Sequence, residues 1–229
     1  FANESGIKVT GSAIIKNSEI SNNTGSRGGG ISIISNYQVK IEGCSFYNNH
    51  VTFEGGAIYS DGLNDPRNKD SLFLQNLKIY ENKAREGAAI YAIRSRVTMN
   101  NSIIHDNELD SGSSSSAYNG VIMLRNNKNI DITNSVISHN SGHAINSYNY
   151  YNSADVRLVN TMVTFNDGIG LADNNTKQSW AVELYYCNYY GNSGQPNIKT
   201  PSNWLLNNVT MNANGDSCDG YYNIQVPPH

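Results

Sequence analysis

The chain has 229 residues, a formal net charge of −3 and only 15% charged residues. It has no basic run that would suggest nucleic-acid binding, and no apolar stretch approaches the roughly 20 residues that a membrane-spanning helix needs. Since it begins at Phe1 without Met or a signal peptide, we expect a mature form or a fragment of a longer protein.

One asparagine recurs at a nearly regular interval and divides the chain into repeats. Successive members of this Asn column are 26, 33, 25, 33, 26, 26 and 22 residues apart, and the residues before each one align without a gap. Self-similarity at such a period is typical of solenoids, so we predict stacked coils. The column comprises Asn23, Asn49, Asn82, Asn107, Asn140, Asn166, Asn192 and Asn214.

Each repeat opens with a short strand, whose positions we count back from the Asn of the same coil. Positions −10 and −8 are apolar in every repeat, whereas position −9 is mostly polar or charged. This alternation predicts a strand with one buried face. The inward pairs are Ala13 and Ile15, Val39 and Ile41, Leu72 and Leu74, Val97 and Met99, Ile130 and Ile132, Val156 and Leu158, Val182 and Leu184, and Trp204 and Leu206.

Position −6 predicts a corner, because Asn and Gly tolerate left-handed backbone angles. Its members are Asn17, Gly43, Asn76, Asn101, Asn134, Asn160, Tyr186 and Asn208. A second strand follows, with positions −5 and −3 pointing inward and −4 and −2 outward, and the Asn column ends it. A third strand is centred on Ile31, Ile58, Ile90, Ile122, Ile145, Leu171 and Ile198.

Strands this short cannot bury a face alone, but they become stable when equivalent strands stack in parallel about 4.8 Å apart. We therefore predict an all-β fold, a right-handed parallel β-helix solenoid of about eight coils with three short strands each. One domain should span residues 1–229, with coils over about 6–214 and a cap or tail over 215–229.

A paired motif in the second coil carries a resemblance to a known family. Phe46-Tyr47-Asn48-Asn49 followed by Gly55-Gly56-Ala57-Ile58 resembles the F-x-x-N and G-G-A-I repeats of polymorphic outer-membrane proteins, which are autotransporter adhesin passengers. More broadly, the chain is similar to the pectin-lyase-like superfamily of right-handed β-helices. The resemblance implies a surface-exposed, non-catalytic stalk or adhesin, although these motifs transfer fold better than function.

Polysaccharide-active enzymes share the predicted fold, so an enzyme is the alternative. The elements Ser141-Gly142-His143 and Asn166-Asp167-Gly168 stand in the reverse order of the polygalacturonase-like motifs, and the paired aspartate and Arg-x-Lys are missing. A pectate-lyase-like site needs clustered acidic calcium ligands. The only dense acidic loop contains Asp61, Asn64 and Asp65, and an exposed turn explains it as well.

The repeat register brings titratable and aromatic residues of neighbouring coils together. Position −2 holds Tyr47, Tyr80 and His105, and position −1 holds Glu81, Asp106 and His139. Two carboxylates about one strand spacing apart would suit a retaining glycosidase, whereas aromatic ladders and solvated corner acids are ordinary features of parallel sheets. We treat these six residues as a candidate ligand face, with no catalytic residue, metal or cofactor assigned.

Three cysteines and five glycosylation sequons complete the candidate sites. Cys187 and Cys218 could form a disulfide if the tail folds back, and the alternative is that Cys44, Cys187 and Cys218 are buried thiols. The sequons, which suggest secretion from a eukaryote only mildly, begin at Asn3, Asn22, Asn100, Asn174 and Asn208.

Together these features predict a non-catalytic structural or adhesive module at the cell surface or outside the cell. A solenoid end exposes unpaired strand edges. We therefore expect head-to-tail self-association or a longer parent chain, and a glycan or cell-surface partner. A polysaccharide lyase or glycoside hydrolase is the alternative function.

Overall fold

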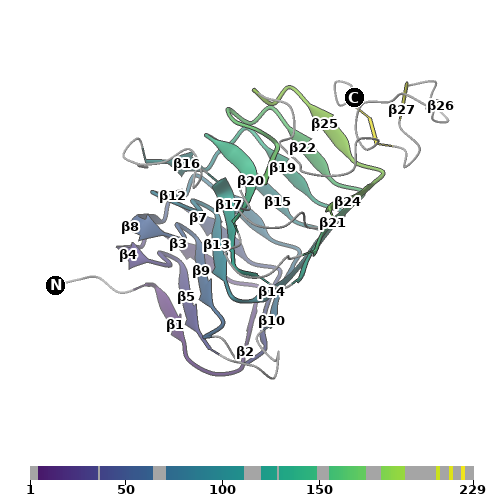
Figure 1. Ribbon diagram of the computed structural model, residues 1–229. Coiled ribbons are helices and arrows are strands. Elements are labelled where there is room, and N and C mark those ends of the chain that lie inside the picture. The colour runs from purple at the N-terminus through teal and green to yellow at the C-terminus, as the bar shows by residue number, and fades with distance from the viewer. Residues whose placement is uncertain are drawn as a thin grey trace.

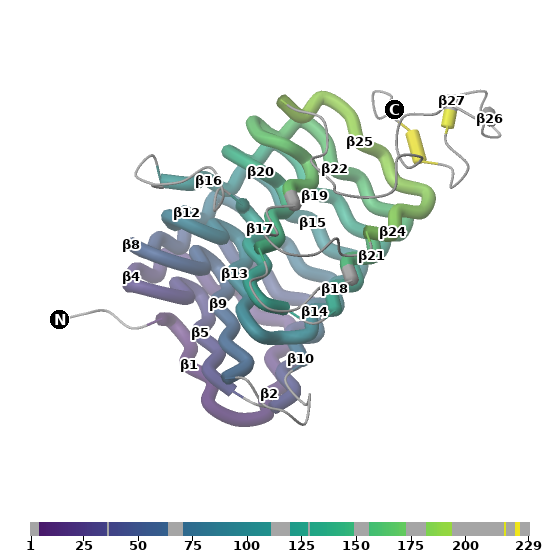
Figure 2. The backbone as a smooth tube through the Cα atoms, viewed as in Figure 1, coloured from purple at the N-terminus to yellow at the C-terminus, as the bar shows by residue number. Residues whose placement is uncertain are grey.

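The computed structural model describes residues 5–35, 37–63, 71–110, 120–127, 129–148, 155–173, 182–193, 210–211, 217–218 and 223–224. Every element in these ranges is a strand. The chain winds into coils that stack along one axis, from the purple N-terminal end to the green end (Figures 1 and 2). No helix that could span a membrane is found in the described ranges.

Three parallel sheets of seven strands each form the walls of the solenoid. Sheet A consists of β1 (Ile7–Val9), β5 (Ile31–Ile34), β9 (Ile58–Asp61), β13 (Ile90–Ile93), β17 (Gly120–Arg125), β20 (His143–Tyr148) and β23 (Leu171–Asp173). Sheet B consists of β2 (Ala13–Lys16), β6 (Val39–Glu42), β10 (Ser71–Gln75), β14 (Arg96–Asn100), β18 (Asn129–Thr133), β21 (Asp155–Val159) and β24 (Val182–Tyr185). Sheet C consists of β3 (Glu19–Ser21), β7 (Ser45–Tyr47), β11 (Lys78–Tyr80), β15 (Ile103–His105), β19 (Val136–Ser138), β22 (Met162–Thr164) and β25 (Asn188–Tyr190).

The strand pairings confirm the predicted register and the parallel β-helix. Position −8 of each coil pairs with position −8 of the next, as Leu74 does with Met99, and position −3 does the same, as Ile79 does with Ile104. The inward residues form one continuous core, in which Ile132 is 1% and Ile137 0% exposed. In the first coil Ala13 and Ile15 are only partly buried, because no earlier coil among the described residues covers them.

The corner at position −6 has the predicted left-handed backbone. Asn76 has a φ of 55° and Asn101 a φ of 50°, and even Tyr186 adopts 56°. A second left-handed position precedes the Asn column, as at Asn48 with a φ of 53°. Two tight corners per coil therefore flank sheet C, and they limit each of its strands to three residues.

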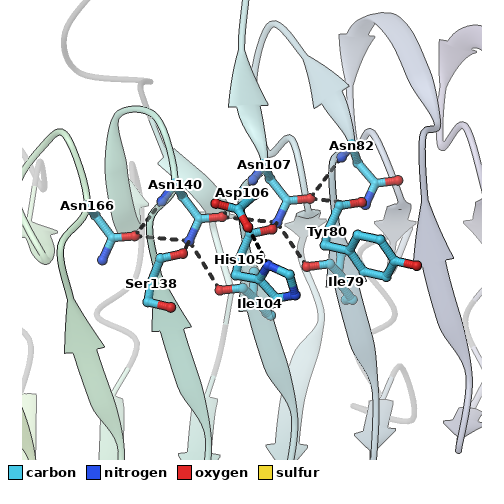
Figure 3. Close-up of polar contacts among 10 residues, drawn as sticks. All are labelled: Ile79, Tyr80, Asn82, Ile104, His105, Asp106, Asn107, Ser138, Asn140 and Asn166. Carbon is cyan, nitrogen blue, oxygen red and sulfur yellow. Dashed lines mark hydrogen bonds and ion pairs between the residues drawn. The ribbon is translucent and has the colours of Figure 1, made fainter. Parts of the chain in front are cut away.

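The Asn column runs through the solenoid as a ladder of amide hydrogen bonds (Figure 3). Each side chain donates from Nδ2 to Oδ1 of the next member at 2.9–3.0 Å, from Asn23 as far as Asn192. The same Oδ1 also accepts the backbone N–H of the preceding member, as Asn107 Oδ1 does from Asn82 at 3.1 Å. Asn214 lies outside the described residues.

The prediction of three strands per coil was incomplete for the first four coils. There a fourth parallel sheet, sheet D, follows the Asn column and consists of β4 (Thr24–Arg27), β8 (His50–Glu54), β12 (Lys83–Ala84) and β16 (Glu108–Leu109). Eight residues lead from Asn82 to Ile90 in the third coil, but only five lead from Asn140 to Ile145 in the fifth. The shorter connection has no room for another strand.

The predicted eighth coil was wrong where the structure describes it. The short strand β26 (Thr210–Met211) pairs antiparallel with β27 (Ser217–Cys218) instead of stacking on sheet C. Residues 223–224 take the place next to β25. Ile224 forms a parallel bridge with Asn188, and Asn223 Oδ1 accepts the amide of Cys187 at 2.9 Å. Seven coils therefore stack in the described part of the chain.

Candidate functional site

The candidate ligand face lies along the corner that ends sheet C. Strands β7, β11 and β15 pair in register, so that Tyr47 aligns with Tyr80 and Tyr80 with His105. These three rings point away from the core and stack on one another. The ring centres of Tyr47 and Tyr80 are 5.1 Å apart, and those of Tyr80 and His105 are 5.3 Å apart.

The stacking decides which ring surfaces a ligand can reach. The planes of Tyr47 and Tyr80 differ by 10°, and those of Tyr80 and His105 by 2°. Both faces of Tyr80 are therefore covered, and a sugar cannot lie between these rings. The neighbour of Tyr47 on its other side is Ser21, which is too small to cover a ring.

The second column of the candidate face is a left-handed corner occupied by functional side chains. The φ angles are 53° at Glu81, 52° at Asp106 and 54° at His139. A non-glycine residue costs about 1–2 kcal/mol in this conformation, so the chain tolerates strain at each of these positions. All three side chains are exposed, and Glu81 donates its amide to the carbonyl of Asp106 at 3.1 Å.

One titratable pair forms on this face. His105 Nδ1 lies 2.6 Å from Asp106 Oδ2, so the carboxylate orients the imidazole ring at the end of the tyrosine stack (Figure 3). Partial desolvation, the Tyr47 hydroxyl and the Glu81 carboxylate raise the pKa of Tyr80 above its ordinary value. Tyr80 therefore remains a hydrogen-bond donor at neutral pH.

His139 does not join the tyrosine stack, and it leads to two residues that the sequence analysis missed. Its ring stacks on Phe165 with the ring centres 5.2 Å apart, and Phe165 meets Tyr190 edge-on at 5.6 Å. Phe165 stands at position −1 and Tyr190 at position −2, so the columns already defined could have identified both. We call the six rings the aromatic row: Tyr47, Tyr80, His105, His139, Phe165 and Tyr190.

The family model described as "Right handed beta helix region" matches residues 1–119, which is more than half of the 229 residues. The chain belongs to the right-handed beta-helix family. No curated protein and no solved structure matches it significantly. Membership in this family agrees with the parallel stacked sheets, and it leaves the activity to be argued from the residues.

Asp61 and His143, which belong to the two enzyme-like motifs, make contacts between coils. Arg94 Nη2 binds both carboxylate oxygens of Asp61, at 2.6 and 2.5 Å, while Asn64 and Asp65 lie outside the described residues. His143 Nδ1 accepts the amide of Ile169 at 2.9 Å and so links two coils. Asp167 is exposed. In the described ranges no group of His, Cys, Asp or Glu side chains could hold a metal ion.

Of the two alternatives for the cysteines, the structure shows the buried thiols and no disulfide between Cys187 and Cys218. All three cysteines are buried thiols, and Cys187 Sγ donates to the carbonyl of Tyr185 at 3.3 Å. Ile224 bridges Asn188 on one side and Cys218 on the other. Two strand spacings therefore separate the two cysteine segments, about 9–10 Å, which exceeds the reach of a disulfide.

The sequons are only partly described. Asn22 is exposed at a left-handed corner with a φ of 57°. Asn100 is half-buried, and its Oδ1 accepts hydrogen bonds from Thr133 Oγ1 and Asn134 Nδ2. The sequons at Asn3, Asn174 and Asn208 lie outside the described residues. Glycosylation at any of the five remains a prediction.

Proposed function

We propose that this β-helix is a non-catalytic structural or adhesive module that acts outside the cell or on its surface, and that the aromatic row is its ligand face. The observation that carries the proposal is the row itself. Six rings from six successive coils line one corner, and each of the six side chains is at least partly exposed. Where two rings stack, the faces that meet are covered. Rings with polar tips, presented on a rigid scaffold, suit glycan or protein recognition.

The geometry limits how a glycan would bind. Since the stacked faces are covered, a sugar ring has access to the edges of the row and to the face of Tyr47 above Ser21. Polar groups surround that face. The Tyr47 hydroxyl lies 3.4 Å from Glu19 Oε2, and Asn22 Nδ2 donates to Ser21 Oγ at 3.0 Å. An aromatic face next to a carboxylate and an amide is therefore the subsite that we expect a saccharide to occupy.

Tyr47→Ala is expected to weaken glycan or partner binding about two- to tenfold, because aromatic stacking contributes about 0.5–1.5 kcal/mol. Tyr80→Ala should weaken binding too, since Tyr80 holds the Tyr47 ring in place. The wild-type chain is first screened on a glycan array, and affinities for the best ligand are then measured by calorimetry. Tyr37→Ala is the matched control, because Tyr37 is 55% exposed and is outside the row. Equal losses in Tyr47→Ala and Tyr37→Ala would contradict the assigned face.

A polysaccharide lyase or glycoside hydrolase is the alternative, and the neighbouring Glu81 and Asp106 favour it. A general acid in a glycosidase is normally held in an apolar site, whereas both of these side chains are exposed and Asp106 is paired with His105. We expect no release of reducing ends or unsaturated products from plant or algal polysaccharides. Turnover that disappears in both Glu81→Gln and Asp106→Asn, with binding retained, would establish the enzyme instead.

We further propose that the rod self-associates head to tail, unless its coils continue in a longer parent chain. Strands β1, β2, β3 and β4 are the last strands of their sheets in the described part of the chain. At the other end, Ile224 covers the edge of β25, since Tyr189 donates to its carbonyl at 3.0 Å, whereas β23 and β24 are the last strands of sheets A and B among the described residues. We therefore expect concentration-dependent dimers in sedimentation velocity. A particle that stays monomeric at the highest soluble concentration would contradict this assembly.

A further inference from the structure

Two glutamates occupy the same position in neighbouring coils, at the corner where sheet D leads into sheet A. The position lies four residues before the first inward isoleucine of sheet A and holds Arg27, Glu54 and Glu86 in the first three coils. Arg27 pairs in register with Glu54 in the parallel sheet, and Glu54 forms a parallel bridge with Glu86. The backbones of the two glutamates are therefore about one strand spacing apart, near 4.8 Å.

The two carboxylates differ in how well their charges are compensated. Glu54 forms an ion pair with the Arg27 guanidinium, and its side chain is only 18% exposed. Glu86 is half-buried, and within the described ranges its Oε2 atom is buried without a hydrogen-bond partner. A buried polar atom without a partner costs free energy, so the corner has unused capacity for a hydrogen bond at Glu86.

The groups that face Glu86 are a carboxylate, two guanidinium groups and a phenol. Glu54 adds negative charge, whereas Arg85 and Arg125 favour the ionised form, and Tyr91 lies close enough for its phenol to feel the Glu86 charge. Arg125 is also engaged elsewhere, since its Nη1 donates to the Tyr91 hydroxyl at 3.4 Å. Burial and the Glu54 charge outweigh the two arginines and raise the pKa of Glu86 above its ordinary value.

Aromatic rings lie near the pair, since Tyr59 feels the charge of Glu54 and Tyr91 that of Glu86. Tyr59 and Tyr91 stack on the outer face of sheet A with ring centres 5.6 Å apart. Together with Met123 and Tyr148 they form a small buried cluster outside the main core. Burial raises the pKa of Tyr91 to about 12, so this phenol stays protonated. A carboxylate next to such a cluster loses part of its hydration, and this loss costs the ionised form more free energy than the neutral acid.

We propose that Glu54 and Glu86 form a proton-binding pair that stabilises the junction of sheets D and A on mild acidification. Glu86 takes one proton from solvent, which removes one of two adjacent negative charges and turns a carboxylate oxygen into an O–H donor. The Glu54 carboxylate, still paired with Arg27, is the nearest acceptor in the register. The pair therefore contributes more to the stability of the rod in a mildly acidic environment than at neutral pH.

The sign of the effect follows from linkage. An unfolded glutamate titrates near pH 4.3, and the folded state holds the Glu86 proton more tightly. The contribution to stability is therefore fully present below the unfolded pKa and is lost as the pH rises through the folded pKa. Glu86→Gln, which mimics the protonated acid, should melt higher than the wild type at pH 7. The difference should vanish near pH 4.

The control and the second readout separate this proposal from a general charge effect. Glu183→Gln, which alters an exposed carboxylate of sheet B, should show no such pH-dependent gain. The carboxyl carbon of Glu86 is also followed by NMR titration in the wild type and in Glu54→Gln. We expect its midpoint to fall when Glu54 loses its charge. A Glu86 midpoint that is ordinary in the wild type, or unchanged in Glu54→Gln, would overturn the proposal, as would a lower melting temperature of Glu86→Gln at pH 7.

Discussion

Asn107→Ala is expected to destabilise the chain much more than Asn23→Ala. Asn107 Oδ1 accepts both the backbone N–H and the Nδ2 of Asn82, and its own Nδ2 donates to Asn140 Oδ1 at 3.0 Å. It also donates to the carbonyls of Ile79 and His105. Removing the amide leaves several of these buried groups unpaired, at about 1–3 kcal/mol for each.

Asn23 is the matched control because it belongs to the same column at the end of the solenoid. Its Nδ2 donates to Asn49 Oδ1 at 2.9 Å, but it is only partly buried, so water replaces much of what the mutation removes. Thermal unfolding and urea denaturation of both variants measure the difference. Equal losses of melting temperature would mean that the ladder contributes nothing beyond local corner geometry.

The register of the solenoid was predictable because identical positions stack. Every described inward residue at position −8 pairs with its equivalent, as Ile41 does with Leu74, and a single slip would turn this column outward. The corner at position −6 was predictable for a similar reason, since left-handed angles select Asn and Gly. Tyr186 shows that the stack imposes this backbone even on an unfavourable residue.

The segments after the Asn column were not predictable from the same alignment. Their length varies from coil to coil, so they have no common register, and sheet D forms only where eight or more residues are available. The Glu54 and Glu86 pair was missed for this reason, because both residues belong to those segments. At the C-terminal end, Asn223 Oδ1 accepts the backbone N–H of Cys187, in the place where an eighth coil would have stacked. No periodic pattern in the sequence predicts this contact.

The candidate ligand face was predictable only in part. The columns placed Tyr47, Tyr80 and His105 together, but whether rings in a column stack face to face depends on their rotamers and not on spacing. The aromatic row moves from position −2 at His105 to position −1 at His139. In the coil of His139, position −2 is occupied by the small residue Ser138, which pairs with His105.

Phe46→Ala is expected to have the largest effect of a single core substitution. Phe46 is fully buried, pairs with Ile20 and Ile79 in the adjacent coils, and lies against Gly30 so closely that a side chain there would meet its ring. Because the coil of Phe46 is paired with a coil on each side, its walls cannot collapse into the cavity without breaking backbone pairing. The loss should reach the upper range for such substitutions, about 3–5 kcal/mol.

Phe53→Ala controls for the loss of a phenylalanine in the same coil. Phe53 lies in β8 and is 44% exposed, so its removal creates no closed cavity and should change the free energy of unfolding by less than about 1 kcal/mol. Urea denaturation of both variants gives the comparison. Similar losses for the two would mean that the interior behind Phe46 can repack freely, and the tightly stacked core described for this β-helix would then be wrong.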